Sequence, residues 1–523
     1  MCAINGFLIN HNRPAHLWKM NDANKFRGPD YSGSWRNNRV ALGHNLLNIN
    51  AVTAMAAQPV ISPRGNILLY NGQAFGVDYF DTQYIVSLLD FGGVNAIKSI
   101  DGQFALAWYN IEAKTITLAR DHFGTKPLFY IEDGGLLFSS SLHAIATAYD
   151  LEPHNPTGTE QFHAQSRFHL GRNTFYKNVY KLFPGEYRTY NVETGKLVRT
   201  GHLHDYVLGE DEMSDDDARD LIRETIKDVV KSPQKTAISL SGGLDSTAIL
   251  SQCYDNSKIF GVTTTYRAEK THKGVHVPYL EDVERAILTA EHYGIKHHET
   301  FLTKKRFGEA KEESLRATMM PTFDYFRTIP RFVAAQEAAK NGAKVFITGD
   351  GGDEIFTGYS GDNRLHDEAY LSRYTIEGAA SWLDTEEMEW FPSDVLGDDA
   401  INNERFVKLM FNESYNFVND AFASYFGMES RAPFMHQGLI RKMLSIPGHL
   451  KLRHPEGQPF DGTHKYYLRE LFKDVLPAHV LEGSKAGFAA PWNSRNEKLN
   501  SKDIGDMSMC IDTFNLSSRK HFD

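Results

Sequence analysis

The 523-residue sequence is poor in cysteine, has no excess of basic residues and contains no long apolar run. Its three cysteines, Cys2, Cys253 and Cys510, are far apart, which is typical of free thiols in a reducing compartment. The formal net charge of −10 leaves no surplus of lysine and arginine for a phosphate backbone, so we expect no nucleic-acid partner. No stretch approaches the ~18 apolar residues of a membrane span, and no signal peptide is recognisable. We therefore expect a cytoplasmic protein with no membrane contact.

The first 200 residues read as short strands separated by glycine- and asparagine-rich turns, for example at 41–44, 67–70, 104–109, 115–118, 136–138 and 186–190. The pattern changes after residue 205, where Ser214 is typical of a helix N-cap and acidic residues follow it. At ~150 residues per domain the length predicts about two to four domains. We place the main boundary so that one domain covers residues 1–205 and the other 206–523.

Beyond residue 230, short apolar strands alternate with helical patterns. The strands are expected at "TAISL", "IFGVTTTY" and "KVFIT", and the helices from about residue 246, at about 280–293 and at about 329–340. Such alternation predicts βαβ crossovers and therefore a parallel sheet. Residues from about 360 to the end read as mostly helical.

The segment "SLSGGLDS", residues 239–246, joins one of these strands directly to a helix. A glycine-rich turn at that point directs backbone N–H groups and a helix N-terminus toward one spot, which favours phosphate binding. The loop lacks the GxxxxGK[ST] pattern of kinases and GTPases, which argues against γ-phosphoryl transfer. A plain Gly-Gly turn with a serine cap is the structural alternative.

A second polar loop, "TGDGGDEIFTGY", follows the strand that ends near Thr348. Asp350, Asp353 and Glu354 then lie just beyond the carboxyl end of a strand, where open α/β sheets bind their ligands. The spacing lacks the ligand series of a calcium-binding EF-hand, so carboxylates facing a phosphate favour Mg²⁺.

The remaining candidate is Cys2, which becomes the first residue once Met1 is removed. A cysteine at that position is an accident, a buried end or a nucleophile that uses the chain's own α-amine as its base. An α-amine has a typical pKa of ~7.7 to 8.0 and can accept a thiol proton near neutral pH.

These features together resemble the asparagine synthetase family, and the resemblance covers nearly the whole chain. It rests on Cys2 and on a series of motifs in the family's order: "RGPD" from Arg27, "QP" at Gln58, "YNGQ" from Tyr70, Asp81, "DGQFALAWYN" from Asp101, "ARDHFGTKPLFY" from Ala119, "SLSGGLDS", Glu281-Asp282, "HHE" from His297, "TGDGGDEIFTGY", "RAPFMHQGLI" from Arg431 and "KAGFAAP" from Lys485.

The resemblance implies two domains of different fold. The N-terminal one is a class II glutamine amidotransferase domain, an α+β domain with an αββα sandwich of the N-terminal nucleophile type. The C-terminal one is an ATP pyrophosphatase domain with an α/β parallel sheet and a helical C-terminal part. The family implies ATP and Mg²⁺ as cofactors, glutamine and aspartate as substrates, and a homodimer.

The resemblance also implies the site residues of the first domain. Cys2 attacks the glutamine carboxamide, and the Asn71 side chain and Gly72 backbone N–H form an oxyanion hole. The glutamine-binding residues carried over are Leu47, Ile49, Asn71, Gly72, Gln73 and Asp81, with Asp81 pairing with the substrate ammonium. Ammonia passes through an internal tunnel to the second domain.

In that second domain the resemblance implies that aspartate is activated as a β-aspartyl-adenylate, which ammonia converts to asparagine. The ATP-binding residues carried over are Leu240, Ser241, Gly242, Gly243, Asp245, Ser246, Val262, Thr348, Gly349 and Lys485. The acyl-adenylate site comprises Asp350, Asp353 and Tyr359, and the metal ligands are Asp245 and Asp353.

Several positions depart from the family pattern. Leu46 stands where the family has an arginine for the glutamine α-carboxylate, which implies that glutamine binding is weak, rearranged, or dependent on Arg36 or Arg39 from the preceding turn. Gln73 replaces a glutamate, Asp350 is shorter than the glutamate of other members, and His436 replaces an aspartate. Two alternatives therefore stay open: an ATP-dependent amide ligase or cyclase for another carboxylate with a degenerate amidotransferase domain, and an ammonia-only or non-catalytic protein.

Overall fold

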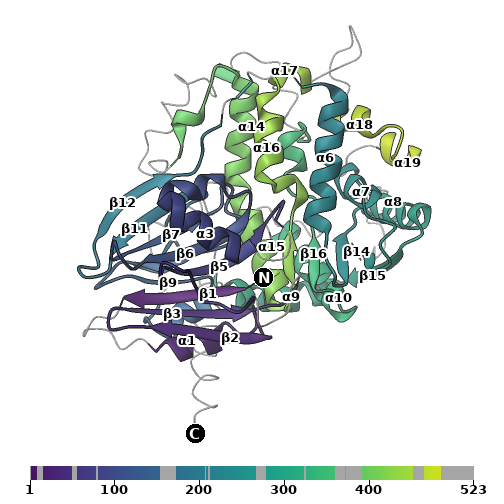
Figure 1. Ribbon diagram of the computed structural model, residues 1–523. Helices are drawn as coiled ribbons and strands as arrows, with labels where there is room; N and C mark the ends of the chain where they lie inside the picture. The colour runs from purple at the N-terminus through teal and green to yellow at the C-terminus, as the bar shows by residue number, and fades with distance from the viewer. Residues whose placement is uncertain are drawn as a thin grey trace.

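The computed structural model describes residues 2–8, 16–49, 56–77, 81–152, 172–206, 208–209, 213–266, 278–322, 325–359, 371–372, 391–451 and 465–483. Two antiparallel sheets form one side of the molecule, and a parallel sheet with most of the helices forms the other (Figure 1). Within the described residues, no helix is long and apolar enough to cross a membrane.

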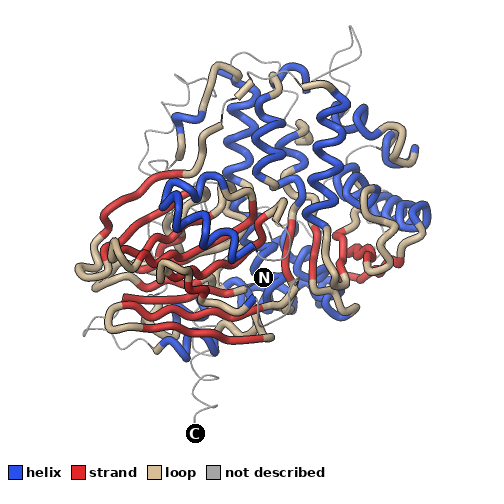
Figure 2. Tube along the Cα trace, viewed as in Figure 1, coloured by secondary structure: helices blue, strands red, loops and turns tan. Residues whose placement is uncertain are grey.

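The first half of the chain forms two six-stranded antiparallel sheets (Figure 2). One has the order β10-β8-β9-β1-β3-β2, from β1 (Ala3–Leu8), β2 (Tyr31–Arg36), β3 (Val40–Leu46), β8 (Phe129–Ile131), β9 (Leu137–Ser139) and β10 (Tyr180–Lys181). The other has the order β12-β11-β7-β6-β5-β4, from β4 (Val60–Ile61), β5 (Ile67–Ala74), β6 (Gly102–Asn110), β7 (Thr115–Arg120), β11 (Glu186–Asn191) and β12 (Leu197–His202).

Alternation of side chains along β5 shows how these sheets stack. Ile67 and Leu69 belong to the core between the two sheets, together with residues of β1 and β3. Leu68 and Tyr70 point the opposite way and pack against α3 (Asp81–Gly92). On the far side of the first sheet, α1 (Leu17–Ala23) packs against β3 and against α4 (Leu142–Ala146). The order of layers is therefore helix, sheet, sheet, helix, which confirms the predicted αββα sandwich.

The second half contains a five-stranded parallel sheet of order β15-β14-β13-β16-β17. Its strands are β13 (Thr236–Ser239), β14 (Ile259–Tyr266), β15 (Lys296–Leu302), β16 (Val345–Ile347) and β17 (Glu429–Arg431). Its helices include α6 (Asp215–Val230), α7 (Leu244–Ser251), α8 (Pro278–Tyr293), α9 (Lys304–Thr318), α10 (Tyr325–Lys340), α11 (Gly352–Ile355), α14 (Ala400–Phe411), α15 (Glu413–Tyr425), α16 (Gln437–Ser445), α17 (Gly448–Lys451), α18 (Tyr466–Phe472) and α19 (Ala478–Leu481). This confirms the predicted α/β sheet with a helical C-terminal part.

The sequence predicted the positions of most of these elements to within a few residues of their observed bounds. Ser214 caps α6, because its hydroxyl accepts the Asp217 N–H at 3.1 Å. Helix α10 starts four residues earlier than expected and includes Pro330. Helix α9 was not expected; Thr303 caps it, and only a few apolar residues mark its buried face. The boundary near residue 205 falls between β12 and α6 and stays a prediction.

Candidate functional site

The chain's first described residue lies beside Asn71 of β5. The Cys2 backbone N donates to Asn71 Oδ1 at 2.9 Å, and Asn71 is fully buried. The other end of this amide, Nδ2, has no hydrogen-bond partner among the described residues. A buried donor without a partner costs free energy, so its retention next to a thiol indicates a position for a ligand oxygen.

Burial raises the pKa of the Cys2 thiol, and the negative charges of Glu429 and Asp81 add to this effect. The positive charge of the chain's terminal amine and the N–H of Leu47 act in the opposite direction. The thiol is therefore protonated at neutral pH and needs a base before it can act as a nucleophile.

Cys2 opens onto a pocket at the edge where the two antiparallel sheets meet. Its lining includes five of the six predicted glutamine-binding residues, Leu47, Ile49, Gly72, Gln73 and Asp81. A Cβ on Gly72 would lie 2.0 Å from the Gln103 carbonyl oxygen, so only glycine lets β5 approach β6 this closely. Asp81 begins α3 and accepts the N–H of Thr82 at 2.7 Å. Burial raises the pKa of Asp81, and its backbone N–H partners oppose the change.

Leu46 also lines this pocket and is buried. The predicted substitutes for a cation at that wall, Arg36 and Arg39, lie at the other end of the β2–β3 hairpin, because Tyr31 pairs with Leu46 whereas Arg36 pairs with Ala41. Five residues of extended strand separate these ends by about 17 Å. The expectation that Arg36 or Arg39 replaces the missing arginine is therefore wrong.

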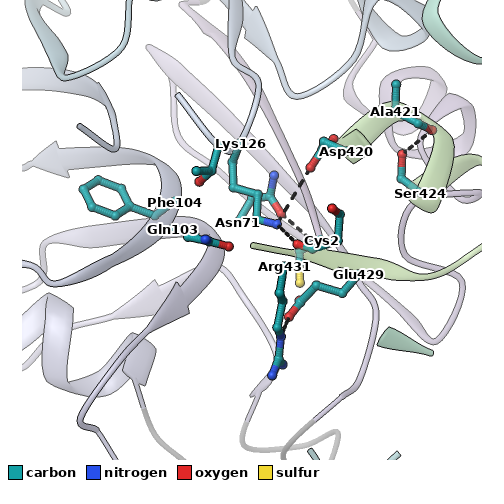
Figure 3. A network of polar contacts seen from close by, with 12 residues as sticks. Cys2, Asn71, Gln103, Phe104, Lys126, Asp420, Ala421, Ser424, Glu429 and Arg431 are labelled. Atoms are coloured by element: carbon teal, nitrogen blue, oxygen red, sulfur yellow. Dashed lines mark hydrogen bonds and ion pairs between the residues drawn. The ribbon is translucent and has the colours of Figure 1, made fainter. Parts of the chain in front are cut away.

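A network of buried polar contacts joins the Cys2 site to the second half of the chain (Figure 3). Arg27 donates to the Cys2 carbonyl oxygen at 3.3 Å and pairs with Asp420 of α15 at 2.7 Å. Lys126 donates to the Ser430 carbonyl oxygen at 2.7 Å. The predicted nucleophile, Cys2, is thus held between the two halves of the chain.

Glu429, the first residue of β17, also lines the pocket. Arg431 donates to its carboxylate at 2.6 Å. Burial alone would raise the pKa of Glu429, but the terminal amine, Arg431 and Lys126 outweigh it and hold this pKa well below its usual range. Glu429 is therefore a second carboxylate beside Cys2, in addition to Asp81. It comes from the half of the chain that contains the predicted nucleotide loop.

The predicted nucleotide loop follows β13 and leads into α7. Ser241 Oγ accepts the Gly243 N–H at 3.2 Å and lies 3.2 Å from Ser246 Oγ. Gly242 has φ +69°, and a Cβ there would lie 2.4 Å from the Ala286 backbone N. Leu240 donates to the Val262 carbonyl oxygen at 2.9 Å, which ties the loop to β14. The turn brings backbone N–H groups to the start of α7, as expected for a loop that binds an anion.

The second predicted loop follows β16, the neighbour of β13, so both loops lie at the carboxyl edge of one sheet. Thr348 donates its N–H to the Arg431 carbonyl oxygen at 3.0 Å, and a Cβ on Gly349 would lie 3.1 Å from Asp245 Cβ. The predicted ATP-binding residues of the two loops are thus brought together. Lys485 lies outside the described residues.

The two predicted metal ligands converge on one cation, Lys465. Its ammonium contacts the Asp245 carboxylate and lies 2.8 Å from Asp353 Oδ1. Burial alone would lower the pKa of Lys465, but the charges of Asp245 and Asp353 outweigh it and raise the pKa well above the usual value. Two carboxylates on one small cation also suit Mg²⁺, which takes one or two carboxylates together with substrate phosphates. The donor set therefore fits the metal, and sequence reasoning missed Lys465 because no motif marks it.

Asp350 is held by two polar side chains from neighbouring helices. Arg331 of α10 lies 2.9 Å from Asp350 Oδ2, and the Asn419 amide of α15 donates to the same oxygen at 2.6 Å. Burial opposes ionisation, but the Arg331 charge and these hydrogen bonds lower the pKa of Asp350. Asp350 is thus a fixed anion whose position depends on α10 and α15.

Glu354, which is buried, pairs with the half-buried Tyr359 beside Asp353. The Tyr359 hydroxyl donates to the Glu354 carboxylate. Burial and the charge of Asp353 raise the pKa of Glu354 to about 7. The folded protein therefore keeps a proton on Glu354 at pH values where the unfolded chain has released it.

Replacement of Glu354 by glutamine is expected to flatten the pH dependence of stability. Between pH ~4.5 and 7 the native state binds the extra proton, so the free energy of unfolding falls as pH rises. At ~1.4 kcal/mol per pKa unit, the raised pKa of Glu354 corresponds to a change of about 3 kcal/mol in the free energy of unfolding over this pH range. Glu354→Gln removes this pH-dependent change. Urea unfolding from pH 4.5 to 7.5, with divalent cations chelated, measures the difference. Parallel curves for native protein and variant would contradict it.

One departure from the family pattern, His436, and one further cysteine, Cys253, have structural accounts. His436 Nδ1 accepts the Leu439 N–H at 3.2 Å and so caps α16, the role that an aspartate would otherwise fill. Its ring stacks on Phe75 with centroids 4.6 Å apart. Cys253 is buried, and burial raises its pKa to about 12, as expected for a structural thiol. Cys510 lies outside the described residues.

Comparisons with known proteins agree with this arrangement. A model of the glutamine amidotransferase domain matches residues 1–200, and a model of the asparagine synthase family matches residues 217–503. Asparagine synthetase B (glutamine-hydrolyzing) of Escherichia coli is 24% identical over 494 residues, which is 89% of this chain and 77% of that protein. The amidase chyE of Penicillium rubens is 26% identical over 365 residues, 64% of this chain and 53% of that protein.

Among solved structures, glutamine phosphoribosylpyrophosphate amidotransferase from B. subtilis matches with a TM-score of 0.27 and 12% identity, over 66% of this chain and 81% of that one. The asparagine synthase model spans more than half of the sequence. The chain therefore belongs to the asparagine synthase family, whose members use ATP.

Proposed function

We propose that the protein is a glutamine-hydrolysing ligase that amidates aspartate to asparagine through a β-aspartyl-adenylate. The Asn71 amide carries the glutamine-dependent part of this proposal. Its Oδ1 holds the Cys2 amine, and its Nδ2 has no partner among the described residues. A degenerate amidotransferase domain would have no reason to keep a buried amide in this state.

In the amidotransferase half-reaction, removal of Met1 turns the Cys2 backbone N into a free amine. Asn71 Oδ1 accepts one of its hydrogens, which directs the nitrogen lone pair toward the thiol so that it can take the thiol proton. The thiolate attacks the carboxamide carbon, and Asn71 Nδ2 with the Gly72 N–H stabilises the oxyanion. Ammonia leaves, and water releases glutamate from Cys2.

In the synthetase half-reaction, the loop from Ser241 to Ser246 binds the pyrophosphate part of ATP. Asp245 and Asp353 would hold Mg²⁺, which neutralises phosphate charge when bound. A carboxylate oxygen of aspartate attacks the α-phosphorus, and pyrophosphate departs. Ammonia then attacks the acyl carbon and AMP leaves. We propose Asp350 as the anion of this acyl site, with Lys485 beside the phosphates.

A second candidate is amidation or cyclisation of another carboxylate, because Leu46 weakens the case for free glutamine and an amidase-named relative matches the chain. We further propose that residues 1–205 and 206–523 form the two domains. The protein is proposed to be a homodimer with a cytoplasmic location.

Pyrophosphate release tests the proposal most directly. Native protein and Cys2→Ala are incubated with ATP, Mg²⁺ and a panel of carboxylates, with either glutamine or ammonium as nitrogen source. We expect asparagine from aspartate and ammonium with both proteins, but from aspartate and glutamine with the native protein only. Pyrophosphate release that requires a carboxylate other than aspartate would instead support the second candidate.

A further inference from the structure

The pocket at Cys2 is lined by negative charge. Its acidic lining residues are Asp81 and Glu429, its other ionisable lining residues are Cys2 and Tyr70, and no lysine, arginine or histidine belongs to the lining within the described residues. The segments next to the lining that the structure leaves undescribed, 50–55 and 78–80, contain none of these three residue types either.

Three basic side chains of the surrounding network have other partners. Arg27 pairs with Asp420, Lys126 donates to the Ser430 carbonyl oxygen, and Arg431 pairs with Glu429. At the pocket wall itself stands the apolar side chain of Leu46, only 3% exposed. A ligand carboxylate placed against this wall would lose its hydration and meet no basic side chain of the described lining, and the chain's terminal amine beside Cys2 is the base of the proposed reaction.

The same pocket suits an ammonium group. Asp81 borders it at the start of α3, and a nearby ammonium would favour the ionised form of this carboxyl group. Gln83, two residues along α3, is exposed and also borders the pocket. The pocket thus opens to solvent close to the carboxylate that would hold the donor's amine.

We infer that Leu46 and the acidic lining make this site prefer a γ-carboxamide donor whose α-carboxylate is blocked, such as a glutamine residue at the N-terminus of a peptide. Such a donor keeps the ammonium for Asp81 and brings no second anion to the Leu46 wall. The rest of the peptide leaves the pocket past Gln83. The inference rests on the proposed hydrolysis at Cys2 and defines the substrate class of that site.

The experiment compares Cys2-dependent deamidation of L-glutamine and of the dipeptide glutaminyl-glycine, with glutamate and glutamyl-glycine measured by mass spectrometry. The native protein is expected to give a kcat/KM at least ~10-fold higher for the dipeptide, mainly through KM; this ratio corresponds to ~1.4 kcal/mol. Leu46→Arg is expected to reverse the preference by restoring a partner for the carboxylate. Leu46→Met, a control of similar volume, should keep the native ratio.

The outcomes separate this inference from the proposed function. A native protein that deamidates free glutamine faster than the dipeptide would overturn the inference alone, whether or not Leu46→Arg folds. Absence of Cys2-dependent deamidation of either donor would overturn the proposed amidotransferase function and the inference together.

Discussion

Replacement of Asn71 by aspartate is expected to lower kcat for Cys2-dependent deamidation by a factor of about 10² to 10³, with little change in KM. The variant keeps an oxygen for the Cys2 amine but loses Nδ2, the buried donor that has no partner among the described residues. In the proposed reaction this donor acts on the oxyanion of the transition state, so its loss should affect turnover more than binding.

Two comparisons make this result specific. Asn71→Ala removes both the acceptor and the donor, so its kcat should be at least as low as that of Asn71→Asp. Amidation with ammonium, which bypasses Cys2, should keep its native rate in both variants. A native kcat in Asn71→Asp would show that this amide only positions the chain's terminal amine.

Replacement of Glu413 by alanine is expected to destabilise the protein by about 3 to 5 kcal/mol. Glu413 begins α15, and its two carboxylate oxygens pair with Arg120 at 3.0 Å and Lys181 at 2.5 Å, both from the first half of the chain. All three side chains are almost fully buried. The variant leaves two cations in the interior without their counter-charge.

Urea unfolding at neutral pH measures this loss. The matched control is Glu193→Ala, which removes an exposed ion pair with Lys114 and should leave the midpoint unchanged. The charges of Lys181 and Arg120 lower the pKa of Glu413 despite its burial. Its stabilising effect is therefore full above the unfolded pKa near ~4.5 and is lost as pH falls below it. A native midpoint for Glu413→Ala would contradict the assigned role.

Regular patterns made much of the fold predictable. Short apolar runs between turn residues located strands such as β5 and β6, and the cap at Ser214 located α6, because these signals depend on local side chains and backbone hydrogen bonding. Helix α9 was missed because its sequence has only a few apolar residues at helical spacing. Its burial comes instead from contacts with α10 and α15.

The structure brings together the predicted site residues that lie in compact motifs, such as the loop from Ser241, and places Cys2 beside Asn71, which the family resemblance implied. The site was not predictable where distant segments contribute single charged residues. Lys465 lies 220 positions from Asp245, and Glu429 reaches Cys2 only because β17 lies against the amidotransferase half. The hairpin register that separates Arg36 from Leu46 likewise required the pairing of β2 with β3.

Two consecutive residues of α15 support the two proposed sites. Asn419 holds Asp350 of the proposed acyl site, and Asp420 holds Arg27, which reaches the Cys2 carbonyl oxygen. The two halves are therefore poorly suited to exchange by recombination, even though each resembles a separate family. A chimera that takes its amidotransferase half from one relative and its synthetase half from another inherits Arg27 and Asp420 from different parents. Such exchanges should succeed only between parents that both have Arg27 and Asp420. Selection on either proposed activity therefore constrains the same turn of α15.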